Sequence, residues 1–437
     1  MSCVTVVTRR QRDKASSTRV GGMTDADQQP IVIVGASLAG ATAAETLRAE
    51  GWSGGIVLIG SETSLPYERP PLSKGVLLGK DQPEVAQLHD QQWYDDNNIE
   101  LRLGKTVTAI DPKAHSVTVD DGSQASYSKL LIATGSRVRR IDVPGADLPG
   151  VHYLRTAEEA QSLTDAYAAK PRVVVVGAGW IGLESASAAR ERGCEVTVVE
   201  PQSTALAAVL GEEIGELFAE FHRQHGVQFR FGTGVEGFEG TDKVTGVRLS
   251  GGEVIPADLV VVGVGVQPNI ELAADAGIEV ATRENGSGIV TGPDLRTSAE
   301  DVYAAGDVVR WDHPLFGRPV RVEHWQNAKD TGKSAAKAML GQDVAHDAIP
   351  FFFTDQFDLG MEYAGDVPRG TSYQVVLRGD PKSGAYVAFW LDDDRHVLAG
   401  MHVNTWGATD TIQELIRSGK QVDPARLADT SVDLADV

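Results

Sequence analysis

The sequence predicts an α/β protein in which one strand–helix–strand unit occurs twice and a small α+β domain follows. The segments "IVIVGASLAGATAAETLRAEGWSGGIVLIGSE" (31–62) and "RVVVVGAGWIGLESASAARERGCEVTVVE" (172–200) each read as a buried strand, a glycine turn, a helix and a second strand. In both segments, sixteen residues separate the first glycine of the turn from the glycine that ends the helix. The tail of the chain, by contrast, alternates short strands with charged turns.

The first unit opens a parallel sheet with strand–helix alternation from Pro30 to about Leu58. A polar, proline-bearing segment follows, "SETSLPYERPPLSKGVLLGK", and then a short helix near "DQQWYDDNNIE". Paired strands are predicted around "VTAIDPKAHSVTVDDGSQASYSKLLIATGS", before the linker "VPGADLPGVHYLRT".

The second unit starts at Arg172 and runs through "GVRLSGGEVIPADLVVVGVGVQPN", where the apolar run Leu259–Val266 is predicted to be one buried strand. The segment "GIVTGPDLRTSAEDVYAAGDVVRW" and the helix "QNAKDTGKSAAKAML" are interpreted as a return to the first unit. The tail from about Ile349 forms the α+β domain.

These observations divide the chain into four parts, because 437 residues are too many for one hydrophobic core. The predicted parts are a disordered extension (1–29), a discontinuous first domain (30–147 and 268–345), a second domain (148–267) and the C-terminal domain (346–437).

Composition excludes several classes of function. The formal charge of −21 argues against a nucleic-acid partner. No apolar run approaches the roughly 20 residues that span a bilayer. The two cysteines, Cys3 and Cys194, exclude a disulfide scaffold and a tetrathiolate metal site, and a site for a metal is not predicted. Such cysteine usage is typical of the cytoplasm.

The first 22 residues contain an Arg9–Arg10 pair, as twin-arginine signals do, but no apolar stretch follows it. We therefore expect an extension without a targeting role, and Met23 is an alternative natural start.

The second glycine turn, Gly177-Ala-Gly-Trp-Ile-Gly182, predicts a dinucleotide site of the Rossmann type. Gly177 permits the tight turn, Gly179 lets a pyrophosphate approach the backbone, and Gly182 lets the helix pack on the strand. The phosphates would lie at the helix N-terminus. Glu200 ends the next strand, where a carboxylate binds ribose hydroxyls and repels a 2′-phosphate, so NADH is favoured over NADPH.

The first glycine turn, Gly35-Ala-Ser-Leu-Ala-Gly40, departs from this pattern because Ser37 occupies the position of the middle glycine. Gly60, and not an acid, aligns with Glu200, so Ser61 or Glu62 is expected to reach the ribose. The presence of two such units in one chain is explained if they bind different nucleotides, one permanently and the other transiently.

Five further motifs give the chain a specific resemblance: "PYERPPLSK" (66–74), "LLIATGS" (130–136), "GAGWIGLE" (177–184), "VYAAGDV" (302–308) and "RVEHWQNA" (321–328). With these motifs the chain resembles, from about Pro30 to Val422, the FAD-dependent pyridine nucleotide-disulfide oxidoreductases. Within that superfamily it is similar to the NADH:ferredoxin reductases of the putidaredoxin-reductase type, which are related to apoptosis-inducing factor. The resemblance implies two Rossmann-like domains of the glutathione-reductase type, the first for FAD and the second for NADH.

The resemblance also implies the cofactor contacts, position by position. Those expected at FAD are Gly35, Ser37, Leu38, Ala39, Gly40, Ser61 or Glu62, Arg69, Lys74, Val107, Ala133, Thr134, Gly135, Arg155, Gly306, Asp307, Glu323, His324, Trp325 and Ala328. Those expected at NADH are Gly177, Gly179, Trp180, Ile181, Gly182, Glu184, Glu200, Val264 and Gly265.

Three of these positions also have a physical reading. Asp307 would accept a ribityl hydroxyl, and Val107 would offer its backbone at the adenine edge. Trp325 opens a helix whose N-terminal amides would stabilise the negative charge that reduction places on the flavin. N-capping by Asp307 and plain packing by Trp325 are the alternatives.

Lys74 and Glu184 are predicted to be the catalytic pair. The resemblance places both near the flavin N5 and the nicotinamide, where Lys74 would compensate charge and Glu184 would orient the carboxamide. A partly desolvated lysine needs a counter-charge, and Glu184 would supply it. The alternative is an exposed ion pair of little consequence.

The missing cysteines decide between chemistries. Disulfide reductases of this architecture need a thiol beside the flavin, but Cys3 lies in the tail and Cys194 begins a strand as a small core residue. Electrons are therefore expected to leave the flavin directly, to a partner protein or a small acceptor. The resemblance implies that the acceptor is a [2Fe–2S] ferredoxin that serves a cytochrome P450 or a ring-hydroxylating oxygenase. The candidate docking cations are Arg310, Arg318, Arg321, Lys329 and Lys333.

One motif departs from the family. Where relatives have "FWSDQ", this chain has "FFTDQ", with Phe353 and Thr354, which bears on how the flavin is shielded and how electrons leave. Two alternatives therefore stay open: a reductase of quinones, monodehydroascorbate or oxygen, and a redox-sensing protein like apoptosis-inducing factor. The sequence leaves both a monomer and a homodimer open.

Overall fold

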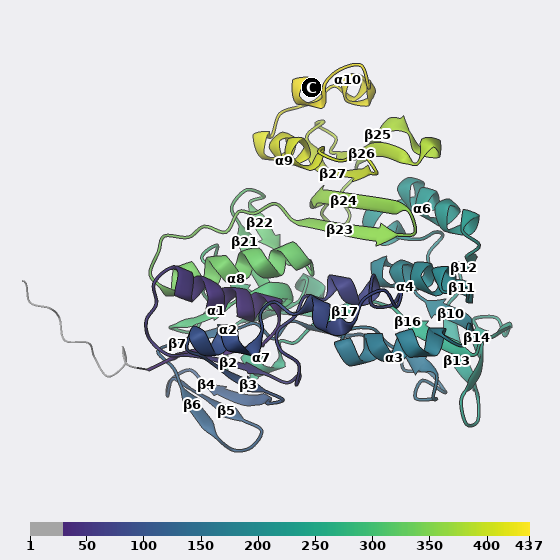
Figure 1. The fold of residues 1–437 in the computed structure, drawn as a ribbon. Coiled ribbons are helices and arrows are strands. Elements are labelled where there is room, and N and C mark those ends of the chain that lie inside the picture. Colours follow the sequence, from purple (N-terminus) through teal and green to yellow (C-terminus); the bar gives the residue numbers. More distant parts are fainter. Residues whose placement is uncertain (1–28) are drawn as a thin grey trace, which may run out of the picture.

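The computed structural model of the chain describes residues 29–437 and shows two α/β units side by side, with a C-terminal domain over them (Figure 1). The extension predicted at 1–29 therefore lies outside the described residues, except for its last residue, as do the Arg9–Arg10 pair and Met23.

The first unit is built on a five-stranded parallel sheet in the order β20-β7-β1-β2-β3. Its strands are β1 (Ile31–Val34), β2 (Ile56–Gly60), β3 (Ile99–Leu103), β7 (Lys129–Ile132) and β20 (Val302–Ala304). All four residues of the central strand β1 are buried, as expected for a parallel strand covered on both faces. Strand β20 comes from the far side of the second unit in sequence, so the chain does return to the first sheet.

Two helices, α1 (Leu38–Ala49) and α8 (Trp325–Met339), pack against each other on one face of this sheet (Figure 1). At their crossing, a Cβ built on Gly332 of α8 would lie 2.5 Å from the carbonyl oxygen of Ala39 in α1. Glycine at position 332 thus lets the two helices approach closely, and this contact fixes where the N-terminus of α8 lies relative to the first glycine turn.

The opposite face carries a small antiparallel sheet of β4 (Val107–Asp111), β5 (Ser116–Val119) and β6 (Gln124–Ser126). A second small sheet contains β18 (Val280–Ala281), β19 (Gly288–Thr291), β21 (Val309–His313) and β22 (Arg318–Val320). The remaining helices of the unit are α2 (Gln91–Asp96) and α7 (Glu271–Asp275).

The second unit repeats the first around the parallel sheet β12-β11-β10-β16-β9. The strands are β9 (Val151–His152), β10 (Arg172–Val176), β11 (Glu195–Glu200), β12 (Gln228–Phe231) and β16 (Leu259–Val262). The helices are α3 (Ala157–Tyr167), α4 (Trp180–Glu191), α5 (Ala207–Leu210) and α6 (Glu212–Gln224). The antiparallel strands are β13 (Val235–Gly240), β14 (Val244–Leu249) and β15 (Val254–Pro256).

Alternate residues of β10 belong to two different cores. Val173 and Val175 pack with α3, α4 and α6, whereas Val174 and Val176 pack with β13–β15. This follows from the period of two along a strand, with both faces covered.

The apolar run Leu259–Val266, predicted to be one strand, is instead split. Strand β16 ends at Val262, and Gly265 adopts a left-handed φ of 95°. The chain then turns into β17 (Val266–Pro268), which pairs with β8 (Ser136–Val138) and so joins the two units. The glycines at 263 and 265 break an otherwise uniform apolar pattern.

The C-terminal domain is a five-stranded antiparallel sheet in the order β23-β24-β27-β26-β25. Its elements are β23 (Phe351–Gln356), β24 (Leu359–Gly365), β25 (Gln374–Asp380), β26 (Ala385–Leu391), β27 (Val397–Val403), α9 (Thr409–Ser418) and α10 (Pro424–Ala428). Strand β23 contacts α4 of the second unit, so this domain packs against that helix (Figure 1). The predicted fold class is confirmed. The numbered domain boundaries stay predictions.

Within residues 29–437, no helix is long and apolar enough to cross a membrane.

We expect Gly332→Ala to destabilise the fold by about 1–3 kcal/mol, because its methyl group would overlap a backbone oxygen of α1 that has no room to move. Higher intrinsic helix propensity of alanine offsets only about 1 kcal/mol. The midpoint of urea unfolding measures the effect. The neighbouring Lys333→Ala, at an exposed position of the same helix, is the control, and equal midpoints for both variants would contradict the packing argument.

Candidate active site

Glu184 accepts three side-chain hydrogen bonds from residues that are distant in the sequence. It lies in the second turn of α4, and its side chain is 4% exposed. Its Oε1 accepts hydrogen bonds from Lys74 Nζ at 2.9 Å and Thr354 Oγ1 at 2.5 Å, and its Oε2 accepts one from Ser73 Oγ. A buried carboxylate of this kind is tolerable because a cation and two hydroxyls compensate the lost hydration.

Lys74 reaches Glu184 from the first unit. The 3₁₀ turn Pro70–Ser73 precedes it, and the two prolines at its start restrict the backbone that delivers Ser73 and Lys74. The Lys74 side chain is 18% exposed. The predicted pair is therefore brought together, and it is largely buried, so the alternative of an exposed pair is wrong.

Aromatic side chains from α8 and β23 adjoin the pair. The ammonium of Lys74 lies 5.3 Å from the centre of the Phe353 ring, and Trp325 meets the same ring edge to face at 6.0 Å. Lys74, Phe353 and Trp325 thus form one wall with Glu184 beside it. The ammonium of Lys74 thus lies over a ring face, the geometry of a cation–π contact.

The N-terminus of α8 presents polar atoms without partners. Among the described residues, the buried atoms Trp325 Nε1 and His324 Nδ1 have no hydrogen-bond partner. No side chain caps the helix. Desolvation lowers the pKa of His324 to about 4, so its ring is neutral at pH 7.

A second network links residues predicted at one cofactor. Arg155 Nη2 forms an ion pair with Asp307 Oδ2 at 3.0 Å, and Arg69 Nη2 forms one with Glu62 Oε1 at 2.7 Å. Arg69 also donates to the carbonyl oxygen of Arg155, and Tyr67 donates to Glu62. Of the two alternatives Ser61 and Glu62, it is Glu62 that joins this network, whereas Ser61 is exposed.

The two glycine turns approach neighbouring backbone closely. A Cβ on Gly35 would lie 2.0 Å from the Ala133 oxygen, and one on Gly177 would lie 2.5 Å from the Gly263 oxygen. Both positions have a positive φ, as the turn requires. At Gly179, in contrast, no atom of the described part of the chain lies within 4 Å of the built Cβ, so this side of the turn is open.

Glu200 lies at the end of β11, as predicted, and faces the second turn. Its Oε2 accepts a hydrogen bond from the Ala178 amide at 2.8 Å, and its Oε1 accepts one from the Gln202 amide at 3.0 Å. A carboxylate has further acceptor sites, which leaves capacity for a ribose hydroxyl.

The other predicted residues cluster around these features. Ser37, Leu38, Ala39 and Gly40 form the start of α1, and Ala133, Thr134 and Gly135 follow β7. Gly306 and Asp307 follow β20, while Trp180, Ile181 and Gly182 open α4 and Val264 and Gly265 follow β16. Val107 starts β4, Ala328 lies in the first turn of α8, and Glu323 is exposed and pairs with Arg321.

The five candidate docking cations are only partly free. Arg318 pairs with Asp366 of the C-terminal domain, and Arg321 pairs with Glu323. Lys329 lies over the Trp325 ring at 4.4 Å, and Lys333 is exposed on α8. The five were predicted because they lie close together in the sequence, and that criterion did not reveal that acidic side chains pair with two of them.

Four residues of the site were not predicted as site residues: Ser73, Phe353, Thr354 and Gln356. Ser73 lies within "PPLSK", next to a residue that was predicted, and the signal for Phe353 and Thr354 was their departure from "FWSDQ". Gln356 lies two residues further along β23, where the strand period places it on the same face as Thr354.

Cys194 is confirmed as a core residue. It is fully buried just before β11, and burial raises the pKa of its thiol. It follows the C-terminal end of α4, whereas Glu184 lies near the helix N-terminus. Of the described residues, Cys194 is the sole cysteine, so none lies beside the Lys74–Glu184 pair.

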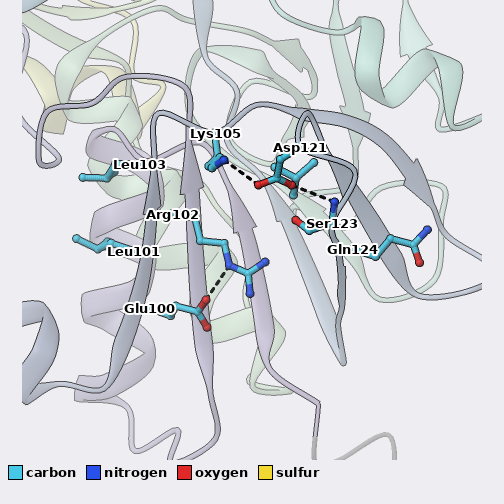
Figure 2. Close-up of a pocket in the computed structure, with 9 residues that line it drawn as sticks. Glu100, Leu101, Arg102, Leu103, Lys105, Asp121, Ser123 and Gln124 are labelled. Atoms are coloured by element: carbon cyan, nitrogen blue, oxygen red, sulfur yellow. Dashed lines mark hydrogen bonds and ion pairs between the residues drawn. The ribbon is translucent and has the colours of Figure 1, made fainter.

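A separate groove of about 500 Å³ lies between β3 and the β4–β6 sheet (Figure 2). Its charged residues are already paired, Lys105 with Asp121 and Arg102 with Glu100. None of the predicted site residues lines it. The groove is therefore no competitor to the site around Glu184.

Comparison with known proteins agrees with this geometry. Residues 29–332 match the family model "Pyridine nucleotide-disulphide oxidoreductase", and residues 351–437 match "Reductase C-terminal". The chain belongs to the pyridine nucleotide-disulphide oxidoreductase family. Its members, ferredoxin–NAD⁺ reductases among them, use FAD and NAD(H).

Individual members of the family are similar over nearly their whole length. The chain is 40% identical to rhodocoxin reductase of Rhodococcus erythropolis over 405 residues, which cover 92% of this chain and 93% of that protein. It is also 40% identical to the ferredoxin–NAD(+) reductase component of an anthranilate 1,2-dioxygenase system of Burkholderia cepacia, covering 93% and 98%. The reductase in a covalent putidaredoxin reductase–putidaredoxin complex superposes with a TM-score of 0.88 at 36% identity, covering 93% and 97%. The predicted resemblance is confirmed.

The residues of this chain fit the family's two cofactors. The open side of Gly179 leaves room for a pyrophosphate, and Trp325 Nε1 and His324 Nδ1 are buried polar atoms that a ligand would satisfy. Helices α1, α4 and α8 all begin without a side-chain cap, which leaves their first amides for ligand oxygens.

We expect Gly179→Val to weaken NAD⁺ binding more than tenfold, because the side chain would fill the space that the pyrophosphate needs. The melting temperature and the flavin content should not change, since no protein atom is close to the new Cβ. Titration calorimetry with NAD⁺ measures the effect. Gly182→Ala is the contrasting variant: its Cβ would lie 2.1 Å from the Gly177 oxygen, so it should lower the melting temperature. Unchanged NAD⁺ affinity in Gly179→Val would contradict the assignment of this turn.

We expect Lys74→Met to destabilise the protein by about 3 kcal/mol, because Glu184 would remain buried without its counter-ion. Adding Glu184→Leu in the same chain should recover most of this loss, since the uncompensated charge is then gone. Urea unfolding of the single and double variants tests both statements. If the double variant is less stable than Lys74→Met, the buried charge is not the source of the loss.

Proposed function

We propose that the chain is an FAD-dependent NADH:ferredoxin oxidoreductase that supplies electrons to a cytochrome P450 or a ring-hydroxylating oxygenase. The observation that carries the proposal is full-length similarity, C-terminal domain included, to a ferredoxin–NAD(+) reductase component of a dioxygenase system. The covalent complex of a similar reductase with putidaredoxin supports a ferredoxin as the acceptor. The low cysteine count supports a cytoplasmic location.

When bound, FAD accepts two electrons as a hydride from NADH and gives them up one at a time. The first unit would hold it, with its pyrophosphate at the start of α1 and its ribityl chain at Asp307. Arg155 already orients the Asp307 carboxylate, and Glu62 and Arg69 are fixed by each other. The N-terminal amides of α8, with Trp325, would face the edge of the flavin that gains charge.

The second unit would hold NADH, with the pyrophosphate at the start of α4 and the ribose at Glu200. The carboxylate of Glu200 is fixed by two backbone amides and would repel a 2′-phosphate. Lys74 and Glu184 would then lie near the flavin N5 and the nicotinamide, where Glu184 would orient the nicotinamide carboxamide and Lys74 would compensate charge. Their mutual ion pair holds both side chains in one geometry before either cofactor binds.

Among residues 29–437 no thiol lies beside the pair, and this supports direct electron transfer to the partner. We propose that the docking surface lies along the first half and the middle of α8, where Lys329 and Lys333 form no ion pair among the described residues. Arg310 lies on the adjoining β21. This surface would attract an acidic ferredoxin despite the overall charge of −21.

We expect the purified holoenzyme to reduce putidaredoxin with NADH faster than it reduces menadione or oxygen. Stopped-flow and steady-state absorbance measure these rates, and NADPH in place of NADH should reduce the flavin at least tenfold more slowly because of Glu200. Rapid peroxide production without a partner protein would favour a small-acceptor reductase. Slow turnover with a change of oligomeric state on adding NADH would favour a redox sensor.

A charge-reversal pair tests the docking surface within the same experiment. Lys333→Glu should raise KM for putidaredoxin about threefold to tenfold at low salt, without changing flavin reduction by NADH. Lys113→Glu, at an exposed turn between β4 and β5, changes the net charge equally and should behave as the wild type. Equal effects of the two variants would contradict the placement.

A further inference from the structure

Three buried polar side chains, two from strand β23 and one from helix α6, form one chain of hydrogen bonds that ends at Glu184. Thr354 Oγ1 lies 2.5 Å from Glu184 Oε1, and Gln356 Nε2 lies 3.1 Å from Thr354 Oγ1. His222 Nε2, on α6 of the second unit, lies 2.7 Å from Gln356 Oε1. All three side chains are at most 1% exposed, and none has a part in the function proposed above.

The direction of these hydrogen bonds follows from one unpartnered atom. Among residues 29–437, His222 Nδ1 is buried and has no partner. An unpaired N–H donor in the interior costs more than an unpaired ring lone pair, so the proton belongs on Nε2. Burial also lowers the pKa of His222 to about 4, which keeps the ring neutral at pH 7.

With the proton on Nε2, each later donor is fixed in turn. His222 donates to the Gln356 carbonyl oxygen, and the Gln356 amide then donates to Thr354 Oγ1. The single hydroxyl proton of Thr354 is left for Glu184. In the opposite orientation, the Gln356 carbonyl oxygen would face Thr354 and accept its hydroxyl proton, which would then not be donated to Glu184. The Gln356 amide would donate to His222 Nε2, so the His222 proton would be on the buried Nδ1, which has no acceptor among the described residues.

The turn that follows β23 holds this strand against α4. Phe357 adopts a left-handed φ of 55°, and its amide donates to Ser187 Oγ of α4 at 2.8 Å. Its ring stacks on His225, just after α6, with 4.1 Å between ring centres. A non-glycine residue is kept in this conformation only when its surroundings over-determine it. The position of Thr354 relative to Glu184 is thereby fixed from the second unit itself.

We infer that Thr354 is a positioning residue for Glu184, and that Gln356 and His222 act through it by fixing the direction of its hydroxyl. The C-terminal domain thus sets the orientation of the carboxylate on the NADH-binding helix. The chain orients and does not relay protons, because a carboxamide such as Gln356 passes a proton only through a high-energy imidic acid form. The inference rests on the role proposed above for Glu184.

Stopped-flow reduction of the bound flavin by saturating NADH is the first test. Thr354→Val keeps the shape and removes the donor, and should slow reduction about tenfold, the loss typical of one hydrogen bond to a charged group. Thr354→Ser restores the hydroxyl and should stay within about twofold of the wild type. In a Glu184→Gln background, Thr354→Val should add less than about twofold, because its effect passes through Glu184.

The outcomes separate the two proposals. If Glu184→Gln is slowed but Thr354→Val is not, or if Thr354→Val slows reduction equally in both backgrounds, the positioning role is overturned while the role of Glu184 stands. If Glu184→Gln reduces as fast as the wild type, the proposed role of Glu184 fails, and the positioning role with it.

The tautomer of His222 is a second test that does not depend on turnover. Nitrogen-15 NMR of the histidine-labelled holoenzyme, with His222 assigned from its loss in His222→Gln, should show the Nε2–H form at pH 7. The signal should shift in Gln356→Leu, which removes the acceptor. An Nδ1–H form in the wild type would reverse the chain of donors and overturn the inference.

Discussion

A carboxylate removed from water must find several donors, and in this protein that requirement fixes how three parts of the chain meet. Glu184 is supplied by α4 of the second unit, Ser73 and Lys74 by the first, and Thr354 by the C-terminal domain. No single part offers enough donors for this group. If the three parts were rearranged, Glu184 would be buried without its donors. The desolvation free energy of an unpaired buried carboxylate is larger than the net stabilisation that the intact ion pair provides. The active site and the domain arrangement therefore depend on the same interaction.

The two copies of the α/β unit have the same arrangement of glycine turn and helix N-terminus. In each copy a glycine turn presses against the backbone that follows a neighbouring strand, at Ala133 or at Gly263, and a helix starts immediately beyond it. The carboxyl ends of both sheets thus present uncapped helix termini, and the linking ribbon of β8 and β17 joins the units near these ends. The C-terminal domain packs on α4 and adds residues to the site that neither α/β unit contains, such as Thr354.

Much of this could be predicted from sequence because the signals are local. The period of apolar residues, the two glycine turns and the acid at the end of β11 are each signals within about 30 residues, and the structure has them where expected. The pairing of Lys74 with Glu184 spans 110 residues and was predicted only by resemblance to a family. The bond from Thr354 to Glu184 depends on which face of β23 meets α4, which the sequence of neither element records. The same reason explains Arg318: its neutralising partner, Asp366, belongs to another domain. The prediction of one strand over Leu259–Val266 was wrong for a different reason: the two glycines at 263 and 265 interrupt the strand despite the apolar pattern.

The hydrogen bonds around Glu184 depend on where the protons lie, and neutron diffraction of a deuterium-exchanged crystal of the holoenzyme observes them directly. It should show Glu184 without a deuteron, with deuterons on Ser73 Oγ, Thr354 Oγ1 and Lys74 Nζ all directed at its oxygens. A deuteron on the Glu184 carboxyl group, or a Thr354 hydroxyl that points toward Gln356, would contradict the central claim.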